Sequence, residues 1–131
     1  MTENMDRDVI YKYSREQAIR DGVLVDVTET AKEAGIKYPT AVTEALWNYI
    51  EPTEKLERMG QSIQGRLWDV LYLFAIATRC VSKGCAELHY DVDFLMENSV
   101  LFETHEVKLK AVCGPGDNHE PVITLMLEDE D

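Results

Sequence analysis

The strongest helical signal in the chain is residues 63–81, IQGRLWDVLYLFAIATRCV. Apolar side chains fall on nearly every face of a helix drawn through this segment, and Lys83-Gly84 is a typical C-terminal signal. A helix that is apolar all round is normally surrounded by protein. We therefore expect one buried central helix. Its longest near-apolar run, residues 67–77, is too short to cross a bilayer.

The sequence after Gly84 changes to a period of two. Apolar residues alternate with polar ones in three successive runs, which contain Leu88, Tyr90, Val92 and Phe94, then Val107, Leu109 and Ala111, then Ile123, Leu125 and Leu127. This alternation is typical of strands with one face on a core and the other in water. It predicts a three-stranded antiparallel meander.

The sequence before the central helix predicts shorter elements. They are a strand over 9–13, a helix over 15–20 capped by Ser14, a strand over 23–27, a helix over 29–34 capped by Thr28, and a helix over 41–50 capped by Thr40. Residues 51–61 read as a loop. The expected fold class is α+β: N-terminal short helices and strand segments, one buried central helix, and the C-terminal three-stranded antiparallel meander packed on it. We expect one domain, 1–131, with flexible ends at 1–8 and 128–131.

The chain is strongly acidic. Its 131 residues include 13 Lys and Arg and 25 Asp and Glu, a formal net charge of −12. Residues 87–131 hold 2 basic and 12 acidic side chains, so this third of the chain carries −10. Such a charge argues against direct binding to nucleic acid or to an anionic membrane, and is compatible with a partner that has a basic surface.

Three cysteines, Cys80, Cys85 and Cys113, are an odd number, and the acidic N-terminus does not resemble a targeting segment. Reduced thiols and a cytoplasmic location are expected. The cysteines and the three histidines lack the paired spacing of zinc ligands. We expect packed cysteines, surface histidines, and neither a metal nor a cofactor.

Three blocks of the sequence resemble a known family. They are Tyr13-Ser14-Arg15-Glu16-Gln17-Ala18-Ile19-Arg20-Asp21-Gly22-Val23-Leu24-Val25-Asp26-Val27, then Gly65-Arg66-Leu67-Trp68-Asp69-Val70-Leu71, then Cys113-Gly114-Pro115-Gly116-Asp117 with Glu120-Pro121-Val122-Ile123-Thr124. Trp47 also falls where that family has a tryptophan. The family consists of small uncharacterised proteins carried on bacterial plasmids, conjugative elements and phages. The resemblance implies the cytosol of a bacterium that carries a mobile element, and it brings no catalytic residues.

Two groups of polar residues are candidates for binding. Glu87, Asp91 and Asp93 lie on the water side of one predicted strand, where residues two apart are spaced roughly 6.6 Å. This interval is close to that between phosphates along a nucleic-acid strand. The acidic face would also include nearby acids, namely Glu97, Glu103, Glu106 and Asp117. The plainer interpretation is a solvated face that Lys108 and Lys110 partly neutralise.

The second group is a pocket between the central helix and the N-terminal segment. Arg66 and Asp69 lie three residues apart near the start of the helix, so they share a face. The other candidate lining residues are Tyr13, Asp21 and Asp26. The plainer interpretation is a partly buried ion pair that holds the first turn of the helix against the N-terminal segment, with Arg66 binding backbone carbonyls. Gly114-Pro115-Gly116-Asp117 reads as a turn, with an anion-binding nest as the alternative.

We expect a non-enzymatic interaction protein of a mobile element. It would inhibit a host defence complex, such as a CRISPR effector or a restriction enzyme, by docking its acidic face on a basic nucleic-acid-handling surface. The alternative is a protein that binds a small ligand or nucleotide signal in the pocket. No catalytic constellation is visible in the sequence. Trp47 and Trp68, on two predicted helices, also allow a homodimer face.

Overall fold

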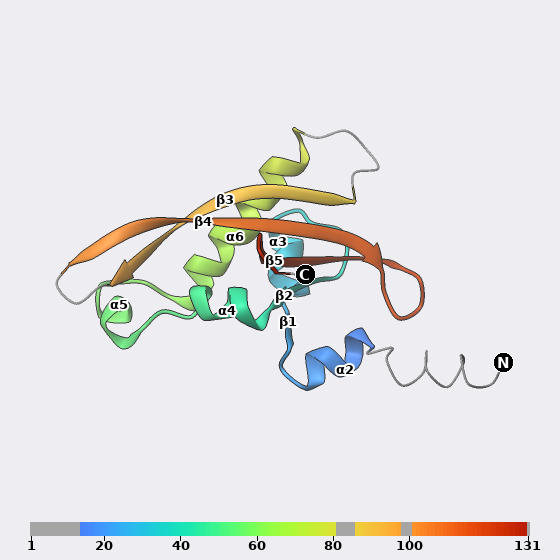
Figure 1. Cartoon of the computed structure of the whole chain (residues 1–131), viewed down its shortest axis with the longest axis horizontal. Coiled ribbons are helices and arrows are strands. Elements are labelled where there is room, and N and C mark those ends of the chain that lie inside the picture. Colours follow the sequence, from blue (N-terminus) through green and yellow to red (C-terminus); the bar gives the residue numbers. More distant parts are fainter. Residues whose placement is uncertain (1–13, 81–85, 98–100, 131) are drawn as a thin grey trace.

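A computed structural model describes residues 14–80, 86–97 and 101–130, and it shows an α+β fold (Figure 1). The helices are α2 (Arg15–Arg20), α3 (Thr28–Glu33), α4 (Glu44–Ile50), α5 (Glu54–Arg58) and α6 (Ile63–Thr78). The strands are β1 (Leu24–Asp26), β2 (Thr40–Thr43), β3 (Glu87–Glu97), β4 (Phe102–Pro115) and β5 (Pro121–Leu127). The strand expected over 9–13 lies outside the described residues.

One five-stranded mixed sheet joins the strands in the order β1-β2-β5-β4-β3. The pairs β3/β4, β4/β5 and β1/β2 are antiparallel, whereas β2 pairs with β5 in parallel. The expected three-stranded antiparallel meander is therefore wrong. The sheet continues past β5 into two strands from the N-terminal half of the chain, so β5 is central.

The error lies in residues 40–43, which the sequence assigned to the cap and first turn of a helix. They form β2, and the helix begins at Glu44, three residues later than predicted. Thr43, not Thr40, is the N-cap, because its hydroxyl accepts a hydrogen bond from the backbone N–H of Leu46 at 3.3 Å. Thr40, Ala41 and Val42 are all buried, as expected for a strand inside a sheet.

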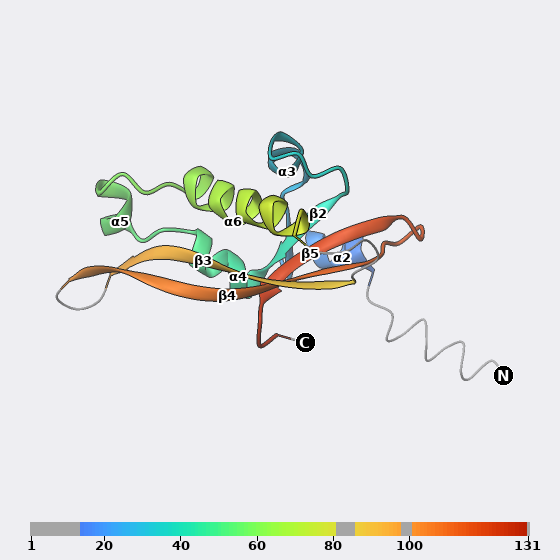
Figure 2. The ribbon, with the colours of Figure 1, turned by 90° about the horizontal axis from the view of Figure 1, so that it is seen from above.

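The hydrophobic core lies between one face of the sheet, here called the inner face, and the helices α3, α4 and α6. Figure 2 shows α6 lying along this side of the sheet. Leu67, Val70, Leu71 and Phe74 of α6 are buried there, and the sheet contributes buried residues that include Val92, Phe94, Leu109 and Leu125. The expectation that α6 is buried on every side is wrong, because Trp68, Tyr72 and Ile76 are exposed on its far side.

The opposite face of the sheet, here called the outer face, has two parts. At β5, Val122 and Met126 are buried, so this central strand is covered on both sides. Helix α2 lies beside β1, and its Arg15 side chain reaches across to Thr124 of β5. Along the β3–β4 hairpin, by contrast, the outer positions are polar and mostly exposed.

Local capping explains the shorter helices. The predicted helix over 15–20 is confirmed, with Ser14 and Gln17 forming a capping box and Gly22 at φ +79° after the helix. Helix α3 differs from the prediction, because Thr28 lies inside it and Asp26 Oδ1 accepts from the Thr28 N–H at 3.1 Å. Helix α5, capped by Thr53, occupies part of the expected loop over 51–61.

Candidate functional site

Five of the seven residues predicted to form the acidic face share the outer face of the β3–β4 hairpin. The core takes Leu88, Tyr90, Val92 and Phe94 of β3, so the alternate positions face outward. These outward positions include Glu87, Asp91, Asp93 and Glu97, and Glu106 of β4 lies opposite Asp93. The structure thus brings these five carboxylates together over two neighbouring strands. We call them the hairpin acidic face.

Two lysines lie on this same surface. Lys108 is opposite Asp91 in the register, and its Nζ is 4.0 Å from Glu106 Oε1. Lys110 is directed elsewhere, because its Nζ donates a hydrogen bond to the backbone carbonyl of Glu130. The described surface therefore sets five carboxylates against two ammonium groups, one of which is held by the C-terminal segment. The hairpin acidic face is net negative.

The other two predicted acids lie apart from this face. Glu103 is opposite Met96, so it points to the other side of the hairpin. Asp117 lies in the turn between β4 and β5, where its carboxylate accepts from the backbone N–H groups of Arg15 at 2.8 Å and Glu16 at 3.0 Å. These are first-turn amides of α2, which have no partner within the helix. Asp117 therefore holds α2 against the sheet.

The turn between β4 and β5 has a geometry that places Asp117 beside α2. The Gly116 N–H donates to the Glu120 carbonyl, closing the loop between β4 and β5. A Cβ atom on Gly116 would lie 2.1 Å from Glu120 Oε1 and 2.9 Å from Val122 Cγ1, so a larger residue would have to displace both of these side chains. The sequence left open whether residues 114–117 form a turn or an anion nest. The structure favours a turn that delivers the Asp117 carboxylate to a helix.

Arg66 has a structural rather than a pocket role. It is only 4% exposed, and its guanidinium donates from Nε to the Ile50 carbonyl at 3.0 Å, from Nη2 to the Tyr49 carbonyl at 2.5 Å and from Nη1 to the Leu95 carbonyl at 2.8 Å. It also lies over the ring of Phe94, 4.9 Å from the centroid. Burial lowers the pKa of Arg66, and the charge of nearby Asp69 acts in the opposite direction.

These contacts connect three segments. The Tyr49 and Ile50 carbonyls end α4, where helix carbonyls lack intrahelical partners and attract positive charge. The Leu95 carbonyl belongs to β3. Arg66 thus ties α6 to the end of α4 and to the distal half of β3, as the plainer sequence interpretation held in part. That interpretation had the first turn of the helix held against the N-terminal segment, whereas these contacts of Arg66 reach α4 and β3.

The residues predicted for one pocket are divided between different places. Asp69 is exposed on the far side of α6, and Asp21 is the C-cap residue of α2. Asp26 lines a cleft beside α2 on the outer side of the sheet. Tyr13 lies outside the described residues. The lining of that cleft includes neither Arg66 nor Asp69.

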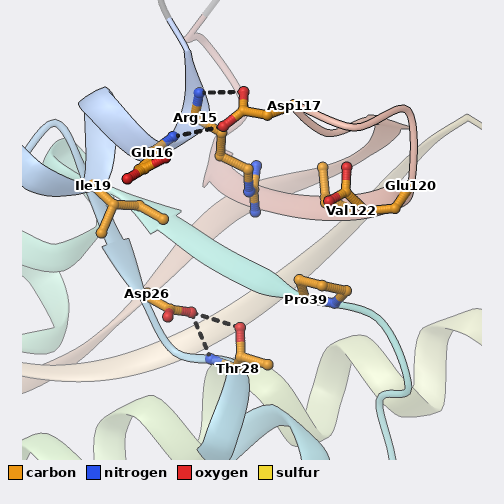
Figure 3. Close-up of a pocket in the computed structure, with 9 residues that line it drawn as sticks. All are labelled: Arg15, Glu16, Ile19, Asp26, Thr28, Pro39, Asp117, Glu120 and Val122. Carbon is orange, nitrogen blue, oxygen red and sulfur yellow. Dashed lines mark hydrogen bonds between the residues drawn. The ribbon is translucent and has the colours of Figure 1, made fainter.

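The cleft beside α2 is a site that the sequence analysis missed (Figure 3). It has a volume of about 240 Å³, and its lining includes Arg15, Asp26, Thr28, Asp117 and Glu120. Arg15 crosses it, donating from Nη1 to Thr124 Oγ1 and from Nη2 to the Ile123 carbonyl, each at 2.8 Å. Burial lowers the pKa of Arg15, while Asp26, Asp117 and Glu120 act to raise it.

Arg15 and the turn are 102 residues apart in sequence, so the pairing is not visible from local patterns. The available signal was the resemblance itself, because its first and third blocks contain both partners. These two blocks meet at this cleft. Arg15 is a charged residue that lies in the first of these blocks and directly follows the predicted N-cap Ser14. This combination would have indicated Arg15 as a candidate site residue.

The cysteines and the possible metal ligands were the remaining candidates for a chemical role. Cys80 and Cys113 are free and exposed, so the expectation that they pack in the core is wrong, and Cys85 lies outside the described residues. Within residues 14–80, 86–97 and 101–130, no group of three or more His, Cys, Asp or Glu side chains is placed to hold a metal. Nor does any helix in these ranges have the length and apolar character needed to cross a membrane.

The fold and its sites define an α+β protein with a mixed five-stranded sheet, an acidic hairpin and a small cleft. The chain belongs to a family of unknown function, DUF6573, whose family model matches residues 3–131. The resemblance to a family of uncharacterised proteins is confirmed at that level. Among curated proteins and among solved structures, none matches the chain.

Proposed function

We propose that this protein is a non-enzymatic interaction protein that binds a basic protein surface through the hairpin acidic face. The observation that carries the proposal is the placement of Glu87, Asp91, Asp93, Glu97 and Glu106 on one side of two paired strands. Among the described helices, α5 and α6 contact β3, and both lie on the inner side (Figure 2). Among the described residues, no helix packs extensively on the outer side of the hairpin, and the C-terminal segment reaches it at His89 and Lys110, so Asp91 and Asp93 stay exposed to a partner.

The geometry of the hairpin suits recognition by charge. A strand holds alternate side chains roughly 6.6–6.8 Å apart along a rigid line. Asp91 and Asp93 have this spacing, which is near the interval between successive phosphates, so a basic groove that handles nucleic acid presents cations that match this pair. Opposite potentials across an interface accelerate encounter and fix orientation. The hairpin acidic face would thus occupy a groove that normally takes a nucleic-acid backbone.

The proposed partner is a host defence complex, such as a CRISPR effector or a restriction enzyme, in a bacterial cytoplasm. This setting is supported by the resemblance to proteins carried on plasmids, conjugative elements and phages. The chemistry of the partner is supported by the net charge of −10 over residues 87–131. Blocking a basic groove requires binding alone, so the proposal assigns no catalytic step to the protein.

The test reverses charge on the face and, as a control, elsewhere. Asp91→Lys/Asp93→Lys changes two outward positions of β3, and Glu29→Lys/Glu33→Lys makes the same net change on exposed positions of α3. Tagged proteins are used to capture partners from a bacterial lysate at low and high salt. We expect the wild type and the α3 variant to retain the same basic protein and the β3 variant to lose it.

Salt dependence separates this mechanism from apolar binding. Capture by the wild type should weaken as salt screens the exposed charges. Retention of the same partner by a folded Asp91→Lys/Asp93→Lys protein would contradict the proposal. So would equal loss of binding in the α3 variant, because net charge rather than the hairpin acidic face would then explain capture.

A second candidate function is small-ligand binding, and the cleft at Arg15 is the observation that favours it. Three carboxylates, Asp26, Asp117 and Glu120, surround one guanidinium there, so the cleft favours a ligand with an amino group over a nucleotide-derived anion. Thermal-shift measurements with spermidine and with a cyclic dinucleotide test this. Stabilisation by spermidine that Asp26→Asn removes would support the cleft, and the absence of a shift with spermidine would refute it.

A further inference from the structure

The far side of α6 carries an apolar stripe that the rest of the described chain leaves uncovered. Trp68, Tyr72 and Ile76 are four residues apart, so they lie above one another on the helix. Their exposed fractions are 37%, 48% and 37%. The rings of Trp68 and Tyr72 are stacked, with centroids 5.9 Å apart and planes 16° from parallel. A preordered aromatic pair of this kind is a typical anchor at protein interfaces.

A groove lies beside the same helix, about two to three turns beyond Trp68. It has a volume of about 310 Å³ between α6 and residues 34–38, and its lining includes Lys37, Tyr38, Ala75, Thr78 and Arg79. Ala75 and Arg79 follow Trp68 by 7 and 11 residues, which at 3.6 residues per turn places all three within about 20° of one flank of α6. The distance from Trp68 to Arg79 along the axis is about 16 Å.

This arrangement is self-complementary. In a two-fold dimer, the same surface of each copy forms the interface. A two-fold axis perpendicular to α6 reverses the helix direction but keeps each flank on its own side. Trp68 of each copy would then meet the groove of the other, and the cationic groups of Lys37 and Arg79 would lie beside its ring. The interface would therefore contain two equivalent contacts, each between Trp68 of one copy and the groove of the other.

The charges of the molecule support the same occupant. Arg66 is buried, so the exposed charged side chains of described residues 61–80 are one acid, Asp69, and one base, Arg79, in a chain whose formal net charge is −12. Two copies therefore repel each other over most of their surface and least at α6. Asp69 and Arg79 lie at opposite ends of the exposed face. An antiparallel pairing brings unlike charges to the same level at both ends, whereas a parallel one sets Asp69 against Asp69.

We propose that the protein forms a two-fold homodimer in which the exposed face of α6 packs antiparallel on the same face of a second copy, with Trp68 of each copy in the groove of the other. This surface lies on the inner side of the sheet, away from the hairpin acidic face (Figure 2). The dimer would therefore present two acidic faces, and its existence does not depend on the proposed function.

The test is sedimentation velocity of the full chain over a range of concentrations. The wild type should approach twice its 15.0 kDa mass as concentration rises. Tyr72→Glu should remain a monomer, because it places a charge in the centre of the interface. The control Phe102→Glu alters an aromatic residue that is 42% exposed on the hairpin, and it should dimerise like the wild type. Circular dichroism checks that each variant is folded.

A charge exchange tests the orientation. Asp69→Arg should raise the dissociation constant of the dimer by about tenfold or more, and Asp69→Arg/Arg79→Asp should recover most of that loss. A wild type that stays monomeric up to about 100 μM, weaker than typical specific association, would overturn the proposal. A dimeric Tyr72→Glu, or a double exchange weaker than the single change, would overturn the interface or its antiparallel order.

Discussion

Replacing Arg66 tests how the structure joins its helices to its sheet. Arg66→Met keeps an unbranched apolar stem and removes the guanidinium, so the perturbation falls on the hydrogen bonds and the ring contact. The substitution leaves three backbone carbonyls, those of Tyr49, Ile50 and Leu95, without the donors they have in the native structure. It also removes the cation that lies over Phe94.

The expected cost follows from those groups. An unsatisfied buried carbonyl costs about 1–3 kcal/mol, and removing one partner from a buried charged network costs about 3–5 kcal/mol. We expect Arg66→Met to lower the free energy of unfolding by about 3–5 kcal/mol, out of about 5–15 kcal/mol for an ordinary domain. Arg66→Lys keeps the charge but not the planar fork, so it should cost about half as much.

The assay is urea unfolding followed by tryptophan fluorescence and circular dichroism. With a slope of about 1.5 kcal/mol per molar urea, the midpoint should fall by roughly 2–3 M in Arg66→Met. Arg58→Met is the matched control, since its guanidinium forms an exposed pair with Glu54 at 2.8 Å and its loss should cost less than about 1 kcal/mol. If Arg66→Met is no less stable than Arg58→Met, the structural role of Arg66 is wrong.

Three further predictions concern other contacts. Asp117→Ala should lower the free energy of unfolding by about 1–2 kcal/mol and increase amide hydrogen exchange in α2, because the Arg15 and Glu16 amides lose their cap; unchanged exchange in α2 would contradict this. Gly116→Ala should destabilise by about 1–3 kcal/mol in thermal unfolding, because its Cβ has no room beside Glu120, and a neutral result would show that the turn relaxes. The Tyr90 hydroxyl donates to the Val70 carbonyl at 3.0 Å, and burial raises the pKa of Tyr90 above its ordinary value of 10.0. Only the unfolded chain then ionises this group above pH 10, so stability should fall there by about 1.4 kcal/mol per pH unit more in the wild type than in Tyr90→Phe, and equal slopes would refute the burial of this hydroxyl.

The sequence predicted the elements whose signal is local. The alternation over β3, β4 and β5 predicted their facing residues, because a strand with one side in water repeats every two residues. It did not predict β2. Four residues are too few to establish a period, and the Val42, Ala45, Leu46 and Tyr49 spacing matches a helix equally well. The parallel pairing of β2 with β5 joins residues about 80 positions apart, as in Thr40 with Ile123, and no local pattern encodes it.

The candidate sites show the same division. Outward acids on β3 followed from alternation, whereas Glu103 was misplaced because a strand reverses its facing with every residue. The Asp117 contact with α2 and the Arg15 contact with β5 connect distant segments and were invisible from spacing. An all-apolar helix such as α6 predicts that every side is covered. The pattern does not distinguish a helix buried by its own chain from one whose exposed side packs against a second molecule.

The most direct test of the acidic docking face is site-specific photo-cross-linking from its centre. A photoreactive amino acid replaces Leu95, which lies on β3 between Asp93 and Glu97, and in a second protein it replaces Glu33 on α3. Both proteins are irradiated in a bacterial lysate, and adducts are identified by mass spectrometry. We expect position 95 to label one basic, nucleic-acid-handling protein, and Asp91→Lys/Asp93→Lys to abolish this adduct. No specific adduct at position 95, or the same adduct from position 33, would contradict this expectation.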